Sequence, residues 1–246
     1  MAAADSGFTA LESKFHARLG LYAIDTGSGR TVAFRADERF AHASTYKALL
    51  VGVLLKDPAT ALDHVVHYRK ADLLEWAPIT SAHVATGMSN RDLMAAAIEH
   101  SDNTAANLLQ AEAGGPEALQ HSIRQLGDAT TTIDRTEPTL NDAEPGDLRD
   151  TSTPRGLGDD LNKLVLGNVL SPERRALLRG WLIGNTTGGP FIRAGVPRGW
   201  TVGDKTGSGG YGTRNDIAVL WPTAGAPIIL PWSPSAASRT RPPTIP

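Results

Sequence analysis

The segment WTVGDKTGSGGYGTRNDIAVLWPTAGAPIIL, residues 200–230, decides the fold. Its short apolar runs are separated by Gly- and Pro-rich turns, and this pattern predicts three strands. Near the other end of the chain, LYAIDTGSGRTVAFRAD, residues 21–37, predicts two strands around a Gly-Ser-Gly turn. The simplest packing is therefore one antiparallel sheet that both ends of the chain build together.

The middle of the chain, from about residue 39 to residue 180, has the period of helices. Ser89 is followed three residues later by Asp92, the arrangement of a capping box at a helix start. Thr153-Pro154 and Ser171-Pro172 each predict an N-cap followed by proline at the first helical position.

The order of these elements predicts a discontinuous domain organisation of class α/β (α+β). Residues 1–38 and 180–230 would form a lobe with the sheet, and residues 39–179 an all-helical lobe. Residues 231–246 contain five prolines and have neither period, so they are predicted to be a disordered tail. An amphipathic helix is expected before the first strand, from the spacing of Phe8, Leu11, Phe15 and Leu19.

Composition sets limits on the function. The chain has 246 residues, 41% of them apolar and 20% charged, which is typical of a globular protein. A net charge of -2 gives no electrostatic reason to expect nucleic acid or an anionic membrane as a partner. No apolar run reaches the length of a membrane span, and the first residues, MAAADSGFTALESKF, do not have the pattern of a signal peptide. The absence of cysteine excludes a disulfide, a thiolate metal site and a cysteine nucleophile.

Ser44 and Lys47 are the first candidates for chemistry, because they open the apolar stretch ASTYKALLVGVLL, residues 43–55. Residues three apart share one face of a helix, so the Lys47 amine can reach the Ser44 hydroxyl. A serine becomes a good nucleophile when a base takes its proton, and burial lowers the pKa of a lysine toward that role. The simpler alternative is that Ser44 caps the helix while Lys47 extends its charge into water.

Three further clusters are weak signals when each is taken alone. Ser101-Asp102-Asn103 precedes a helical stretch and is, by itself, a good N-cap. Lys205-Thr206-Gly207, followed by Ser208, lies on a predicted strand, where a glycine favours close approach of a ligand; the alternative is an ordinary edge strand. Residues 135–150, RTEPTLNDAEPGDLRD, form either a solvated acidic loop or a functional one, because irregular segments of this length are uncommon in compact domains.

The ordered set Ser-x-x-Lys, Ser-Asp-Asn and Lys-Thr-Gly resembles the motif set of class A β-lactamases and penicillin-binding proteins. The resemblance to the class A serine β-lactamase family extends from about residue 8 to residue 230, since SDNTAANLL, VATGM, GDKTGSG and RNDIAV also look like that family. It implies a β-lactamase/transpeptidase-like fold, with a sheet from both chain ends flanked by helices beside a helical lobe. It also implies that residues 135–150 are the Ω-loop.

The resemblance implies a hydrolase that opens a small-molecule β-lactam through an acyl-serine, acts as a monomer, and uses no cofactor and no metal. His64 and His67, three apart on a predicted helix, are accordingly interpreted as surface imidazoles. The implied catalytic residues are Ser44, Lys47, Ser101 and Glu137. The implied substrate-binding residues are Trp76, Asn103, Asn141, Lys205, Thr206, Gly207, Ser208 and Arg214. An implied structural pair, Arg135 with Asp150, would close the base of the Ω-loop.

The roles carried over by the resemblance are specific. Ser44 would attack the lactam carbonyl, and its proton would leave through Lys47 or through a water held by Glu137 and Asn141. The lactam oxygen would enter a hole made by the backbone N–H groups of Ser44 and Ser208. Ser101 would relay a proton to the lactam nitrogen.

The remaining implied roles concern substrate binding and the loop. The substrate carboxylate would lie near Lys205, Thr206 and Arg214, and Asn103 would bind a side-chain amide. Trp76 would lie at the mouth of the site, or would simply pack. The Glu137–Pro138 bond would be cis, which proline permits.

The end of the chain departs from the family pattern. In the family, a long C-terminal helix follows the last strand and packs on the sheet; here Pro231 is expected to interrupt that strand, and the helix is missing. Two alternatives to a β-lactamase follow: an inactive remnant on a damaged scaffold, and a penicillin-binding D-Ala-D-Ala peptidase, which would not need Glu137 and Asn141. The missing signal-peptide pattern leaves two alternatives, a cytosolic protein or a mature form whose export signal has been removed; the resemblance implies a secreted or periplasmic protein.

Overall fold

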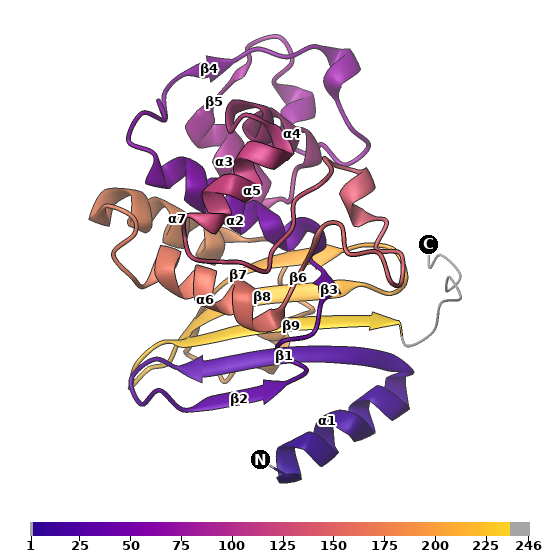
Figure 1. The fold of residues 1–246 in the computed structure, drawn as a ribbon. Helices are drawn as coiled ribbons and strands as arrows, with labels where there is room; N and C mark the ends of the chain where they lie inside the picture. The colour runs from indigo at the N-terminus through magenta and orange to yellow at the C-terminus, as the bar shows by residue number, and fades with distance from the viewer. Residues whose placement is uncertain (1, 237–246) are drawn as a thin grey trace.

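The computed structural model describes residues 2–236 and contains a five-stranded antiparallel sheet in the order β2-β1-β9-β8-β7 (Figure 1). The sheet predicted from both chain ends is confirmed, because the N-terminal strand β1 pairs with the C-terminal strand β9. The strands are β1 (Ala17–Asp25), β2 (Thr31–Phe34), β7 (Thr201–Ser208), β8 (Arg214–Trp221) and β9 (Ile228–Ala236).

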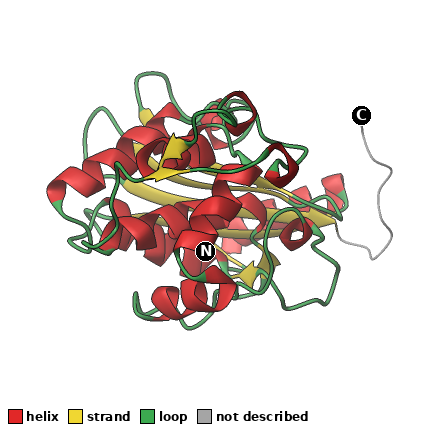
Figure 2. Ribbon diagram, turned by 90° about the horizontal axis from the view of Figure 1, so that it is seen from above, coloured by secondary structure: helices red, strands yellow, loops and turns green. Residues whose placement is uncertain are grey.

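Helices cover one face of this sheet and fill the upper part of the molecule in Figure 1. The longer ones after the first hairpin are α2 (Tyr46–Lys56), α3 (Asn90–Glu99), α4 (Asn103–Glu112), α5 (Gly115–Arg124), α6 (Pro154–Val165) and α7 (Pro172–Gly184). The short elements are α8 (Ile192–Gly195), β3 (Phe40–Ala41), β4 (Val65–Val66), β5 (Met88–Ser89), β6 (Thr151–Ser152), and the 3₁₀ turns η1 (Ala43–Thr45), η2 (Lys70–Asp72), η3 (Thr80–Ala82) and η4 (Thr139–Asn141). In the view from above, helices lie in front of the strands and beside them (Figure 2).

The main core lies between these helices and the inner face of the sheet. Helix α2 runs through it and is apolar on all sides, with Leu49, Leu50 and Val51 fully buried. Ile217 and Val219 of β8 reach the same core from the sheet, while Ala218 and Leu220 alternate to the outer face. A helix that is apolar all round is buried, so Lys47, in its first turn, is buried too, whereas Lys56 lies at its less buried C-terminal end.

The predicted helix starts are confirmed by their caps. The Ser89 hydroxyl accepts from the backbone N–H of Asp92 at the start of α3. Thr153 and Ser171 likewise cap α6 and α7, and each is followed by proline at the first helical position.

Two local predictions were wrong. The first helix, α1, spans Ala2–Phe15, and Leu19 of the predicted stripe lies in β1, because the chain turns at His16, where φ is +49°. The helix lies against the outer face of the sheet, where Phe8 contacts the Phe34 ring. His64 and His67 flank the short strand β4 rather than lying on a helix. Within residues 2–236, no group of three His, Cys, Asp or Glu side chains is placed to hold a metal ion.

The disorder predicted from residue 231 onward was also wrong for residues 231–236, which belong to β9. Pro231 lies opposite Ile217 of β8, and Pro234 lies opposite Leu19 of β1. Each proline removes one ladder donor, but its φ is compatible with a strand, and the remaining residues pair on both sides. No helix follows β9 in the part of the chain that the structure describes; the rest of the predicted tail, residues 237–246, lies outside it.

Candidate active site

A cavity of about 300 Å³ lies where the helices meet the β7 end of the sheet. It brings together nine of the predicted residues: Ser44, Trp76, Ser101, Asn103, Asn141, Thr206, Gly207, Ser208 and Arg214. Lys47, Glu137 and Lys205 lie directly beneath and bind the lining residues. Arg135 and Asp150 lie apart from the cavity, at the base of the Ω-loop.

Ser44 lies in the η1 turn that leads into α2, so its hydroxyl faces the cavity at the start of a buried helix. Its Oγ donates to Glu137 Oε1 at 3.2 Å, across 93 residues of sequence. Ala43, directly before it, has a φ of +45°, a conformation that costs free energy and is concentrated at functional sites. The serine is therefore presented to a carboxylate by a strained turn.

Lys47 is completely buried and has an acceptor for each of its three protons. Its Nζ donates to Ser101 O at 2.9 Å and to Asn103 Oδ1 at 2.6 Å, and forms an ion pair with Glu137 Oε1 at 2.9 Å. Among the hydrogen bonds of residues 2–236, none joins Lys47 to Ser44 directly; Glu137 contacts both. Burial lowers the Lys47 pKa, although the Glu137 charge opposes that shift.

The Ser-Asp-Asn cluster forms the N-cap of α4, and Ser101 also lines the cavity. Asp102 is the N-cap of α4: its Oδ1 accepts from Ala105 N, and its Oδ2 accepts from the backbone N–H of Thr80. The cap fixes the chain so that Ser101, with a φ of +55°, turns its hydroxyl toward two lysines. Lys205 Nζ donates to this hydroxyl at 3.0 Å, and Lys47 Nζ lies 3.4 Å from it.

The Lys-Thr-Gly segment lies on the edge strand β7, beside the serine turn. Burial, together with the nearby Lys47 charge, lowers the Lys205 pKa to about 7. Gly207 permits the close approach of backbone that its position in a strand predicts: a Cβ there would lie 2.9 Å from His42 O and 3.1 Å from Ser44 N.

The Ω-loop is closed at its base by the predicted pair. Arg135 Nε donates to Asp150 Oδ2 at 2.6 Å, and the other Asp150 oxygen accepts from two backbone N–H groups of the loop. Glu137, two residues after Arg135, is joined to Pro138 by a cis bond, as the resemblance implies. Asn141 Nδ2 forms a short hydrogen bond with Glu137 Oε2.

Three residues of the site have no role in the sequence interpretation. Asn107 holds Glu137 in place, because its side chain bonds both the N–H and the C=O of that residue. Its place in SDNTAANLL, one turn beyond Asn103, was the available signal. Thr187 and Phe191 line the cavity from the segment between α7 and α8, which carries no motif. Phe191 lies under the Arg214 guanidinium, 4.9 Å from ring centroid to Cζ.

Comparison with known proteins places this geometry in a family. The sequence profile described as the β-lactamase enzyme family matches residues 3–233. A β-lactamase of Amycolatopsis lactamdurans is 58% identical over 229 residues, which cover 93% of this chain and 76% of that protein.

Solved structures agree. The class A β-lactamase from Clostridium kluyveri DSM 555 superposes with a TM-score of 0.95 at 45% identity, covering 97% of this chain and 92% of that one. An ancestral class A β-lactamase gives a TM-score of 0.93 at 47% identity, covering 95% and 91% of the two chains. With the profile covering nearly all the described residues, the chain belongs to the β-lactamase enzyme family and has the fold of its class A members.

Proposed function

We propose that this chain hydrolyses the β-lactam amide bond of penicillins and cephalosporins through a covalent acyl-Ser44 intermediate. The observation that supports this most directly is the buried chain of contacts from Ser44 Oγ to Glu137 Oε1 and from there to Lys47 Nζ. A serine hydroxyl that donates to a carboxylate is activated for attack, because the carboxylate can accept its proton. The activity would give resistance to β-lactam antibiotics.

In the acylation step, Ser44 Oγ attacks the lactam carbonyl carbon and its proton passes to Glu137. The direct contact between these two side chains favours Glu137 over Lys47 as the first acceptor, because the three Lys47 protons already face acceptors. The developing oxyanion would be bound by the backbone N–H groups of Ser44 and Ser208, which the Gly207 contact brings close together.

Ring opening needs a proton on the lactam nitrogen, and Ser101 is placed to deliver it. Its hydroxyl bridges Lys205 and Lys47, so a proton leaving through Ser101 can be replaced from either ammonium group. Glu137 then returns the serine proton to this pair of lysines through Lys47, whose Nζ lies 2.9 Å from Glu137 Oε1, so the carboxylate is free again before deacylation. The lowered Lys205 pKa makes this transfer easier near neutral pH.

Deacylation would be the second use of Glu137. Its carboxylate is fully buried, is held by Asn141 and lies 3.2 Å from Ser44 Oγ, so a water admitted beside the acyl bond would lose a proton to it. Glu137 would pass this proton to Ser44 Oγ as the acyl bond breaks, which restores the free enzyme. Arg214, Lys205 and Thr206 would bind the substrate carboxylate, and Asn103 with the exposed Trp76 would contact its side chain. The proposed steps use side chains, two backbone N–H groups and water.

The peptidase alternative uses the same serine and lysines but has no need of the Glu137–Asn141 pair, so that pair favours the lactamase. The test is ring opening of a chromogenic cephalosporin by the purified chain, with Ser44→Ala as the matched control. Loss of turnover in Ser44→Ala is expected; turnover at the parent rate in that variant would overturn the nucleophile. Release of D-alanine from a D-Ala-D-Ala peptide, without cephalosporin turnover, would favour the peptidase.

We further propose, from the resemblance, that the chain acts outside the cytoplasm and as a monomer. No helix within residues 2–236 is long and apolar enough to cross a membrane. Cell fractionation of a producing strain and light scattering of the purified protein test the two statements separately. Thermal unfolding of the same sample at a low Tm and with low cooperativity would instead support the damaged-scaffold alternative.

A further inference from the structure

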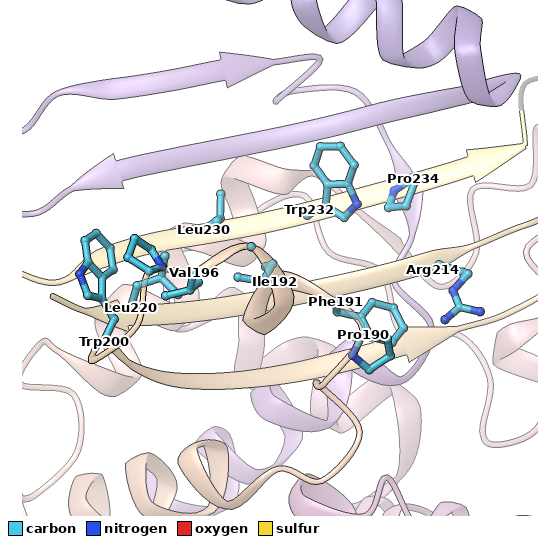
Figure 3. A pocket seen from close by; sticks show the side chains of 12 residues that line it. Pro190, Phe191, Ile192, Val196, Trp200, Arg214, Leu220, Leu230, Trp232 and Pro234 are labelled. Atoms are coloured by element: carbon cyan, nitrogen blue, oxygen red, sulfur yellow. The ribbon is translucent and has the colours of Figure 1, made fainter.

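The outer face of the sheet carries a second cavity, of about 560 Å³, on the side away from the main helical cluster. Leu220 of β8 and Leu230 and Trp232 of β9 form its floor (Figure 3). The segment that contains α8 forms its wall, with Val196 and Trp200. A volume of this size lies within the range of small-molecule sites, roughly 300–1,000 Å³.

This outer groove, as we name the cavity, shares two residues with the candidate active site. Phe191 and Arg214 line both cavities. Among the described residues that line the groove, only Arg214 is charged. It is exposed, and no ion pair or side-chain hydrogen bond of the described chain, residues 2–236, involves it. Its one recorded partner is the Phe191 ring, so the guanidinium is free to pair with an anion.

The groove is long and has the cation at one end. Trp200 lies at the end opposite Arg214, and Leu220 is close to Trp200 (Figure 3). Arg214 and Leu220 are the same strand's first and seventh residues, and a strand rises about 3.3 Å per residue, so they are roughly 20 Å apart. Within residues 2–236, the side chains that line the groove between these two residues are apolar apart from the tryptophan N–H groups, and none is a carboxylate, hydroxyl or amide.

We propose that the outer groove binds an aliphatic carboxylate, with its alkyl chain on Leu220, Leu230 and Trp232 and its carboxylate on Arg214. An alkyl chain fits this lining better than an extended peptide does, because an extended peptide brings backbone N–H and C=O groups that the apolar floor leaves unpaired. The guanidinium selects an anion over a neutral chain of the same length.

The proposal also links the groove to catalysis, and this link rests on the proposed function. Arg214 is expected to bind the carboxylate of the β-lactam, so the aliphatic carboxylate and the β-lactam would compete for the same guanidinium. An occupied groove should therefore raise the KM for a β-lactam while leaving kcat unchanged, since the reacting atoms near Ser44 are not displaced.

Binding is measured first without any β-lactam, so its outcome is independent of hydrolysis. The full chain is titrated with decanoate, and with butanoate and 1-decanol as probes that lack the chain or the charge. Fluorescence from Trp200 and Trp232 should change saturably with decanoate, at least tenfold more weakly with 1-decanol, and not at all with butanoate. No saturable change with decanoate, or equal affinity for 1-decanol, would overturn the proposal.

A variant then places the binding in the groove. Gly195 lines it, and a Cβ there would meet no heavy atom within 4 Å, so Gly195→Trp fills the groove without touching the catalytic residues. It should abolish the decanoate signal and keep parent hydrolysis rates. In the parent, saturating decanoate should raise KM several-fold; bound decanoate with an unchanged KM would overturn the shared use of Arg214. The ligand series stands without the variant, should Gly195→Trp not fold.

Discussion

Glu137→Ala removes the carboxylate on which both halves of the proposed reaction depend. Its Oε1 lies 3.2 Å from Ser44 Oγ and 2.9 Å from Lys47 Nζ, and its side chain is fully buried. Alanine leaves the water of the deacylation step without a base. General-base catalysis contributes about 10²–10⁴-fold, so kcat should fall by at least about 100-fold, which is roughly 2.7–5.5 kcal/mol in activation free energy.

Acylation should survive in this variant because Lys47 can replace the lost base. Burial lowers the Lys47 pKa, and the Glu137 charge is the largest influence that opposes this shift. Without that charge the Lys47 pKa falls further, so the amine becomes neutral more readily. A neutral amine keeps two hydrogen bonds, to Ser101 O and Asn103 Oδ1, and has a lone pair for the Ser44 proton.

The assay follows both steps. Mass spectrometry of the variant after brief exposure to a penicillin should show stoichiometric acyl-protein, and the parent should show little. Glu144→Ala is the matched control, since Glu144 is an exposed carboxylate of the same loop; it should hydrolyse at the parent rate. Turnover by Glu137→Ala at the parent rate would refute the role of this carboxylate. If Glu137→Ala formed no acyl-protein, Lys47 would not be able to act as the base in its place.

Three other variants test the scaffold around the site. Asp150→Asn breaks the buried pair with Arg135; at about 3 kcal/mol or more, and roughly 2–4 °C per kcal/mol, Tm should fall by roughly 10 °C, whereas Asp63→Asn in an exposed pair should change Tm little. Gly207→Ala should lower kcat at least tenfold with a small change in Tm, because its Cβ would press on Ser44 N; unchanged kinetics would contradict the close-approach argument. Burial raises the Asp160 pKa from 3.8 to about 8, so the folded chain keeps a proton that the unfolded chain loses, and this stability is present below about pH 4 and lost as the pH rises through about 8. Urea unfolding should accordingly show Asp160→Asn gaining stability over the parent between about pH 5 and about pH 9; an equal difference at both values would contradict the raised pKa.

Local patterns in the sequence predict much of the fold. The short apolar runs between Gly- and Pro-rich turns at both ends of the chain predict β1, β2, β7 and β8, and pairing with neighbouring strands fixes their register. The caps at Ser89, Thr153 and Ser171 are local hydrogen bonds, so local sequence is enough to predict them. The same reasoning assigned Leu19 to the first helix, because Leu19 lies four residues after Phe15 and so continues the helical spacing by chance. In the structure it is the third residue of β1.

The site is less accessible to such reasoning, because its contacts join distant segments. Spacing alone pairs Lys47 with Ser44, yet the folded chain gives each of them Glu137 as a partner from the Ω-loop. The resemblance identified Glu137 as a candidate catalytic residue, but it gave no role to Phe191, whose ring lies under Arg214. No pattern near Phe191 marks it, since its place in the cavity comes from the packing of α8 against the sheet.

The last strand shows why composition misjudged the end of the chain. Proline content predicts disorder when no other pattern is present, but an alternation continues through residues 229–234: every second side chain, at Ile229, Pro231 and Ser233, is buried. Trp232, on the opposite face, lies opposite Leu21 of β1 and Asp216 of β8, so this residue joins the N-terminal hairpin to the C-terminal one. Loss of two ladder donors is a local cost, whereas loss of β9 would divide the sheet. The same alternation turns Leu230 and Trp232 to the outer face, so the strand that joins the two halves of the sheet also forms part of the floor of the outer groove.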